Sequence, residues 1–170
     1  MRHDGRMSDP PAEPPLEAYG RVSDPERFRI LHDQVYELIL DLLRRYAVEP
    51  SIDPAVWRQG AHTEELRLTP EADGAAELSF SLTDFPGVAV RFGRWHEESY
   101  PWCGCDACDE DPDLLVEDLR AKVGALVNGR FSERVRAGLN PGFSYDFGHG
   151  RGGGQLDRQT ALERRPFLSG

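Results

Sequence analysis

The sequence lacks any hydrophobic run that approaches the roughly 20 apolar residues needed to span a bilayer. Its N-terminus has no apolar signal-peptide core behind it, and its three cysteines form an odd number that cannot pair completely. Lysine is nearly absent, since Lys122 is the only one among 20 basic residues. We therefore expect a cytoplasmic protein that has no membrane partner and no disulfide scaffold.

Basic residues are also fewer than acidic ones: the chain has 20 basic and 30 acidic residues, and its net charge is -10. Phosphate recognition needs clustered Lys and Arg, so this balance argues against nucleic acid and favours a basic protein partner. The phosphate-binding, dinucleotide-binding, nucleophile-elbow and paired-histidine motifs of common enzymes are missing. Whether the protein is an enzyme is left open, and a non-enzymatic role is favoured.

The chain of 170 residues is long enough for one domain with loose ends. Residues 1–19 are rich in proline and acidic residues, which predicts a disordered arm. Residues 148–170 begin with five glycines in seven positions, which predicts a flexible tail. A single folded domain is expected over residues 20–147.

Two helices are predicted by their start signals and apolar spacing. Ser23 and Glu26 fit a capping box, and apolar residues recur at helical spacing behind them, so we expect a helix over residues 24–47. Asp111 is placed to cap a second helix that begins at Pro112 and stops at Asn128-Gly129.

The segments 66–69, 78–82 and 88–92 alternate apolar and polar residues and are separated by turn signals, which predicts an antiparallel meander. Residues 143–147 alternate in the same way and predict an additional edge strand, while 131–139 fit a short helix or a strand. The expected fold is α+β, a two-layer sandwich of a three- to four-stranded sheet with both helices on one face.

All three cysteines lie within six residues, and His96 precedes the first of them by seven positions. Zinc prefers four tetrahedral ligands drawn from thiolate and imidazole, and a CxxC pair supplies two of them from one turn. The pattern predicts a zinc site made by Cys103, Cys105, Cys108 and His96. With four protein ligands such a site would be closed, and therefore structural rather than catalytic.

Two other interpretations use the same cysteines. Cys105 and Cys108 could cycle between dithiol and disulfide, or all three thiols could simply fill a tight loop. The acidic residues around them raise thiol pKa values, whereas the start of the second helix lowers them, and the sequence does not rank the two effects. The expected function is thus a small acidic interaction module with a cysteine-rich loop that is held together by structural zinc. The alternative is a thiol-redox protein or enzyme that uses Cys105 and Cys108.

The segment Cys103-Gly104-Cys105-Asp106-Ala107-Cys108-Asp109-Glu110, together with Phe85-Pro86-Gly87 and Gly93-Arg94, resembles an uncharacterised family of actinobacterial proteins. The resemblance spans about residues 19 to 147. It implies an orphan cytoplasmic domain, and it transfers no catalytic residue.

Overall fold

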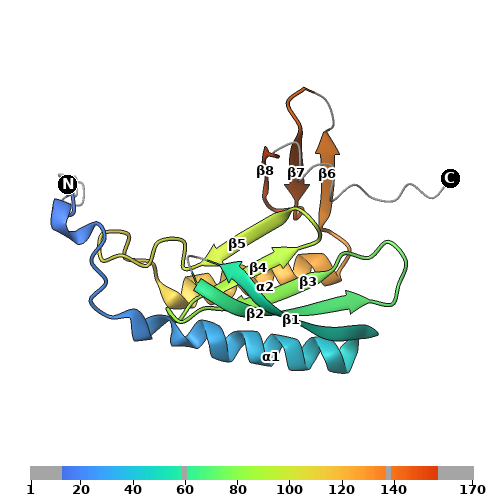
Figure 1. The fold of residues 1–170 in the computed structure, drawn as a ribbon, viewed down its shortest axis with the longest axis horizontal. Helices are drawn as coiled ribbons and strands as arrows, with labels where there is room; N and C mark the ends of the chain where they lie inside the picture. The colour runs from blue at the N-terminus through green and yellow to red at the C-terminus, as the bar shows by residue number, and fades with distance from the viewer. Residues whose placement is uncertain (1–12, 59–60, 137–138, 157–170) are drawn as a thin grey trace, which may run out of the picture.

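The computed structural model describes residues 13–58, 61–136 and 139–156. Its main body is an antiparallel sheet in the order β1-β2-β3-β4-β5 with two long helices beside it (Figure 1). The elements of this body are α1 (Ile30–Arg45), β1 (Val48–Arg58), β2 (Ala61–Pro70), β3 (Leu78–Leu82), β4 (Val88–Phe92), β5 (His96–Tyr100) and α2 (Pro112–Val127). The predicted α+β class and its two main helices are confirmed.

One apolar core joins both helices to the same face of the sheet. Leu31 and Val35 of α1 and Leu119 of α2 are fully buried in one cluster with Phe80 and Val90 of the central strands. Phe80 lies between Ser79 and Ser81, and Val90 between Ala89 and Arg91, so the period-2 pattern places the large apolar side chains on one face of the sheet. The two-layer arrangement with both helices on one face is as expected.

The sheet has two strands more than the three that the sequence predicted for its meander. β1 contains Pro50 and Pro54, which discourage a strand assignment, but β1 lies at the sheet edge where a missing backbone donor is tolerated. β5 lies at the opposite edge of the sheet. Its sequence is mostly polar, with Glu98 in the middle, and therefore lacks the apolar alternation that predicts a strand. Its inward-facing side chains hydrogen-bond to one another, and the rings of His96 and Tyr100 also pack in the core.

The first helix begins later than predicted. Residues Pro25–Arg29 form a 3-10 turn, and the α-helix proper runs from Ile30 to Arg45. Ser23 does not cap it, because its amide and its hydroxyl both donate to the carboxylate of Asp106. The second helix follows the prediction, since Asp111 Oδ1 accepts a hydrogen bond from the Asp113 amide at 2.9 Å.

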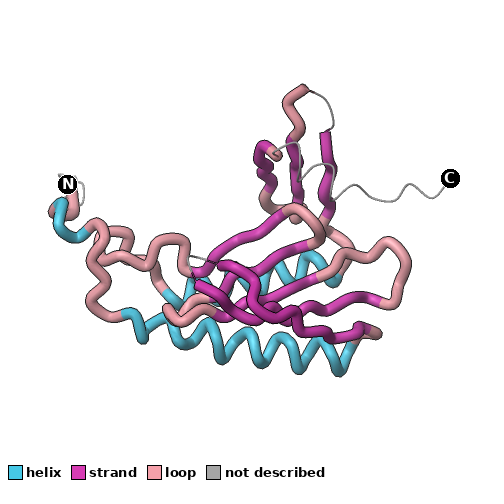
Figure 2. The backbone as a smooth tube through the Cα atoms, in the orientation of Figure 1, coloured by secondary structure: helices cyan, strands magenta, loops and turns pink. Residues whose placement is uncertain are grey.

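A second antiparallel sheet stands at one end of the main body (Figure 2). It consists of β6 (Ser132–Arg136), β7 (Gly142–Asp146) and β8 (Arg151–Gln155). The predicted strand at 143–147 therefore does not extend the meander but forms the centre of this small sheet. Glu133 of β6 ties the two sheets together by accepting hydrogen bonds from the Arg94 and Trp95 amides, at 2.7 and 3.0 Å.

The glycine-rich stretch predicted as the start of a flexible tail is a strand over Arg151–Gln155. Glycine suits this position because a Cβ added at Gly154 would lie only 2.9 Å from Cε1 of Phe143 on the paired strand. Glycine composition alone predicted flexibility because it says nothing of a neighbouring strand. The remainder of the predicted tail, residues 157–170, lies outside the described residues.

The described part of the predicted N-terminal arm contains ordered structure. Residues 1–12 lie outside the described residues, but Leu16–Ala18 form a 3-10 turn and Ala18 is buried.

Within the described part of the chain, neither of the long helices has the length and apolar character needed to cross a membrane.

Candidate metal centre

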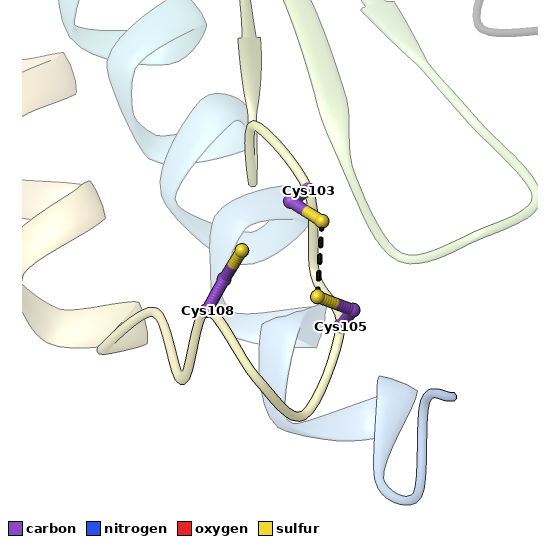
Figure 3. Close-up of side chains that lie close together, drawn as sticks. All are labelled: Cys103, Cys105 and Cys108. Carbon is purple, nitrogen blue, oxygen red and sulfur yellow. Dashed lines mark hydrogen bonds between the residues drawn. The ribbon is translucent and has the colours of Figure 1, made fainter. Parts of the chain in front are cut away.

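The three cysteines lie in the loop that connects β5 to α2, and their side chains gather on one side of it (Figure 3). The sulfur atoms of Cys103, Cys105 and Cys108 all lie within 4.8 Å of one another. The Cys103 thiol donates to the Cys105 sulfur at 3.1 Å, and none of the three forms a disulfide. Cys105 is buried, whereas Cys103 and Cys108 are exposed.

One carboxylate shapes the first half of the loop. Glu110 accepts hydrogen bonds from the amides of Trp102, Cys103 and Gly104 at 2.8–2.9 Å. Burial of the Glu110 side chain opposes its ionisation, but these three amides outweigh the burial and lower its pKa. The Glu110 carboxylate thus fixes the backbone that carries the first cysteine.

Glycine is required at position 104 for two reasons. Its φ of 72° lies in the left-handed region, which side chains with a Cβ disfavour. A Cβ built there would also lie 2.8 Å from Cζ of Phe85. The turn from Cys103 to Cys105 therefore depends on the absence of a side chain between them.

The second half of the loop is a tight turn around Cys105. Its carbonyl accepts hydrogen bonds from the amides of Cys108 and Asp109, at 3.1 and 3.2 Å. This turn brings the Cys108 sulfur back toward the other two, as the CxxC spacing predicts.

Hydrogen bonds within the loop shift the pKa values of two of the thiols in opposite directions. The hydrogen bond from Cys103, with those from the amides of Cys108 and Gly20, lowers the pKa of Cys105 to about 6. The hydrogen bonds to Cys105 and Cys103 raise the pKa of Cys108 to about 12. Cys105 therefore gives up its proton more readily than Cys108, and a cation would have to displace thiol protons to bind all three sulfurs.

The acidic residues that were expected to repel thiolates are each engaged by a donor. Asp106 binds Ser23 and Arg21, which lower its pKa to about 2. Asp109 pairs with Arg27 at 3.1 Å, and Asp111 caps α2. These partners offset the negative charge around the cluster, so the predicted repulsion is weaker than the sequence suggested.

The structure does not bring His96 to the cysteines. Its Nε2 lies 2.9 Å from Oε1 of Glu98, and its ring stacks on Tyr145 with the centroids 3.5 Å apart. His96 is at the start of β5, and its side chain faces the core. Proximity in sequence was misleading here because the strand carries its alternate side chains toward α2 and away from the loop.

His96 instead belongs to a buried polar network that sequence reasoning missed. The Tyr100 hydroxyl lies 2.8 Å from carboxylate oxygens of both Glu98 and Asp118 and shares its one proton between them, and Lys122 forms ion pairs with the same two carboxylates. Two signals could have revealed it: polar residues at alternate strand positions 96, 98 and 100, and an acid-lysine pair four residues apart on α2.

A second concave feature lies between the C-terminal ends of α1 and α2 and the β2–β3 connection. It is an apolar cavity of about 500 Å³, lined among others by Leu42, Leu68, Leu78 and Phe131. None of its lining residues carries a carboxylate, a histidine or a cysteine. The cavity therefore offers no ligand for a metal ion and no carboxylate or imidazole for acid-base chemistry.

The spacing of the sulfurs fits a common ligand. Around a tetrahedral zinc ion with bonds of about 2.3 Å, two thiolate sulfurs are about 3.8 Å apart. The observed sulfurs lie 3.1 Å apart for Cys103 and Cys105 and within 4.8 Å for every pair, so they bracket that spacing. Thiolates are the ligands that soft metal ions prefer. The cluster could therefore hold a metal ion.

No curated protein matches the chain, and no solved structure matches it either. The model of a family of unknown function, DUF6226, matches residues 2–167. This match confirms the resemblance to an uncharacterised family, and it extends beyond the span of 19 to 147 that the motifs suggested. The chain therefore belongs to this family of unknown function, DUF6226.

Proposed function

We propose that the protein is a small acidic interaction module whose cysteine loop is stapled by a Zn²⁺ ion bound to Cys103, Cys105 and Cys108. The observation that carries the proposal is the convergence of the three sulfurs within 4.8 Å in one loop. Binding releases the thiol protons, and the cation then offsets the repulsion among the thiolates that are formed.

The fourth coordination position is left to a water or to a side chain from outside the cluster. His96 is held by Glu98, and among the described residues the group of converging ligand atoms contains the three cysteines alone. Because Cys103 and Cys108 are exposed, a ligand from a partner protein can reach the ion. This arrangement replaces the closed site of three thiolates and one imidazole expected from the sequence.

The surroundings of the loop support an interaction role. Trp102 on the same loop is 75% exposed, and tryptophan is enriched among the residues that dominate protein interfaces. The net charge of -10 favours a basic partner, which long-range attraction would bring to the surface. We therefore propose a basic protein partner and no enzymatic reaction.

Elemental analysis of protein purified without chelator tests the metal. We expect one zinc per chain, and we expect the thiols to resist alkylation until a chelator removes the ion. Cys105→Ser should lose the zinc, whereas His96→Asn, the matched control, should keep the full stoichiometry when measured on folded protein. Metal-free wild-type protein, or loss of zinc in the His96 variant, would contradict the three-thiolate site.

The thiol-redox alternative, for which the sequence suggested Cys105 and Cys108, is supported by the Cys105 pKa of about 6. The thiol that lies 3.1 Å from the Cys105 sulfur is that of Cys103, so Cys103 is the partner that the geometry favours. A thiolate next to a second thiol can exchange with a disulfide. Mass mapping after mild oxidation distinguishes the two functions. A reversible disulfide in a protein that binds no zinc would favour the redox function, and bound zinc that shields the thiols would exclude it.

A further inference from the structure

Residues 16–24, which precede the 3-10 turn Pro25–Arg29, lie against the cysteine loop. The Ala107 amide donates to the Ala18 carbonyl at 3.2 Å, and the Asp106 amide donates to the Arg21 carbonyl at 2.8 Å. Figure 1 shows this N-terminal stretch running beside the loop between β5 and α2. We call residues 16–24 the docking segment.

One carboxylate holds the docking segment by its side chains. Asp106 lies between Cys105 and Cys108, and its oxygens accept hydrogen bonds from Arg21 Nε at 2.7 Å and from the amide and hydroxyl of Ser23 at 2.8 and 2.7 Å. Just beyond the segment, Arg27 reaches Asp109 at 3.1 Å. The residues that contact the docking segment, Asp106 and Ala107, therefore lie between Cys105 and Cys108.

The contact between the docking segment and the loop includes a buried residue. Ala18, whose carbonyl accepts from the Ala107 amide, is buried, and so is Cys105, two positions before Ala107. The docking segment therefore packs next to the buried member of the cysteine cluster.

We propose that the docking segment is the outer wall of the metal site, so that metal binding and docking of residues 16–24 strengthen each other. This inference rests on the proposed function, because it requires that the three cysteines bind a metal. A metal-bound loop holds Asp106 and Ala107 in the positions that the segment contacts. By linkage, the factor by which zinc tightens docking equals the factor by which docking tightens zinc binding.

Loss of the metal would then free the docking segment. The loop would retain its Glu110 contacts, but the turn from Cys105 to Cys108 would lose the ion that joins its ends. The position of the segment would thereby depend on the state of the cysteine cluster. The exposed side chains of Leu16 and Tyr19 would move with it.

The rate of trypsin cleavage after Arg21 measures docking. The peptide bond after Arg21 is protected from the protease while residues 16–24 are hydrogen-bonded to the loop, and it becomes accessible when they undock. On the full chain we expect saturating zinc to slow this cleavage at least tenfold relative to chelator-treated protein. Cleavage after Arg120, within α2, serves as the internal measure of global unfolding. Zinc should slow cleavage after Arg21 more than cleavage after Arg120.

Asp106→Ala removes the contacts of one carboxylate and leaves all three thiols in place. We expect it to abolish the zinc-dependent protection of Arg21 and to weaken zinc binding, measured by competition with a chromogenic chelator, roughly tenfold. Ser23→Ala should give a smaller loss in both measurements. Asp84→Ala, which makes the same charge change at an exposed position in the β3–β4 turn, is the matched control and should change neither.

The outcomes separate this inference from the function on which it rests. If wild-type protein binds one zinc but cleavage after Arg21 is unaffected, or if Asp106→Ala binds zinc as tightly as wild type, the coupling is wrong and the metal site stands. If wild-type protein binds no zinc in the elemental analysis, the metal site and the coupling are both wrong.

Discussion

Nε2 of His96 lies 2.9 Å from Oε1 of Glu98, inside the domain and next to α2. Glu98 also accepts hydrogen bonds from Tyr100 and Lys122. Burial opposes the ionisation of Glu98, but its three donors outweigh the burial and lower its pKa from 4.5 to about 2. The polar network therefore makes the stability of the fold depend on pH.

The first prediction concerns acid unfolding. Since the folded-state pKa of Glu98 is depressed, its contribution is fully present above about pH 4.5 and is lost as the pH falls toward 2. The loss should be about 3 kcal/mol of the free energy of unfolding, measured by urea denaturation at a series of pH values.

Glu98→Gln should flatten the acid side of this pH profile, while it lowers the stability at pH 7. Glu64→Gln, an exposed carboxyl on β2, is the control and should leave the profile unchanged. A profile of Glu98→Gln that keeps the wild-type slope between pH 4.5 and 2 would show that another carboxyl carries the acid sensitivity.

The second prediction concerns Lys122, whose ammonium pairs with Glu98 and Asp118 and is 15% exposed. Lys122→Met leaves a buried carboxylate without its cation, which should reduce the free energy of unfolding by about 3 kcal/mol in thermal or chemical denaturation. The double variant with Glu98→Gln should recover part of that loss, because no unpaired charge then stays buried. Additive losses in the double variant would argue against a coupled pair.

The polar network also shows where sequence reasoning failed. The apolar alternation at 78–82 and 88–92 correctly predicted β3 and β4, because apolar burial is encoded within each segment. β5 was missed because polar side chains are buried in it, and some of the partners that stabilise their burial come from α2, far along the sequence. The same holds for β8, whose glycines become a strand only beside Phe143 of β7.

The candidate site was likewise predicted where it depends on nearby residues and missed where it depends on distant ones. The six-residue cluster of cysteines predicted correctly that three sulfurs converge, because a short loop cannot separate them far. The expected ligand His96 came from the strand before the loop, where the direction of the side chain is fixed by the sheet. The docking segment could not be foreseen at all, since Ser23 and Asp106 are 83 positions apart and each has an ordinary local role as a cap or turn residue.

The third prediction tests the carboxylate that shapes the loop. In Glu110→Gln, an amide NH₂ would replace one of the oxygens that accept from the backbone amides of residues 102–104. We expect a loss of about 2 kcal/mol in the free energy of unfolding and weaker zinc binding in the chelator competition. Glu117→Gln, an exposed site on α2, is the matched control. Wild-type zinc affinity in Glu110→Gln would mean that the cysteine geometry does not depend on this carboxylate.

The last prediction separates backbone strain from crowding in the loop. Gly104 and Gly74 have nearly the same φ, 72° and 74°, but a Cβ at Gly74 would meet no atom within 4 Å, whereas one at Gly104 would meet Phe85. Gly74→Ala should therefore cost about 1 kcal/mol from the left-handed conformation alone. Gly104→Ala should cost more than this in chemical denaturation and should also weaken zinc binding, because the clash with Phe85 displaces the backbone between Cys103 and Cys105. Equal losses of stability in the two variants, with zinc affinity intact in both, would show that the loop tolerates the displacement and that the sulfurs are not held by this turn.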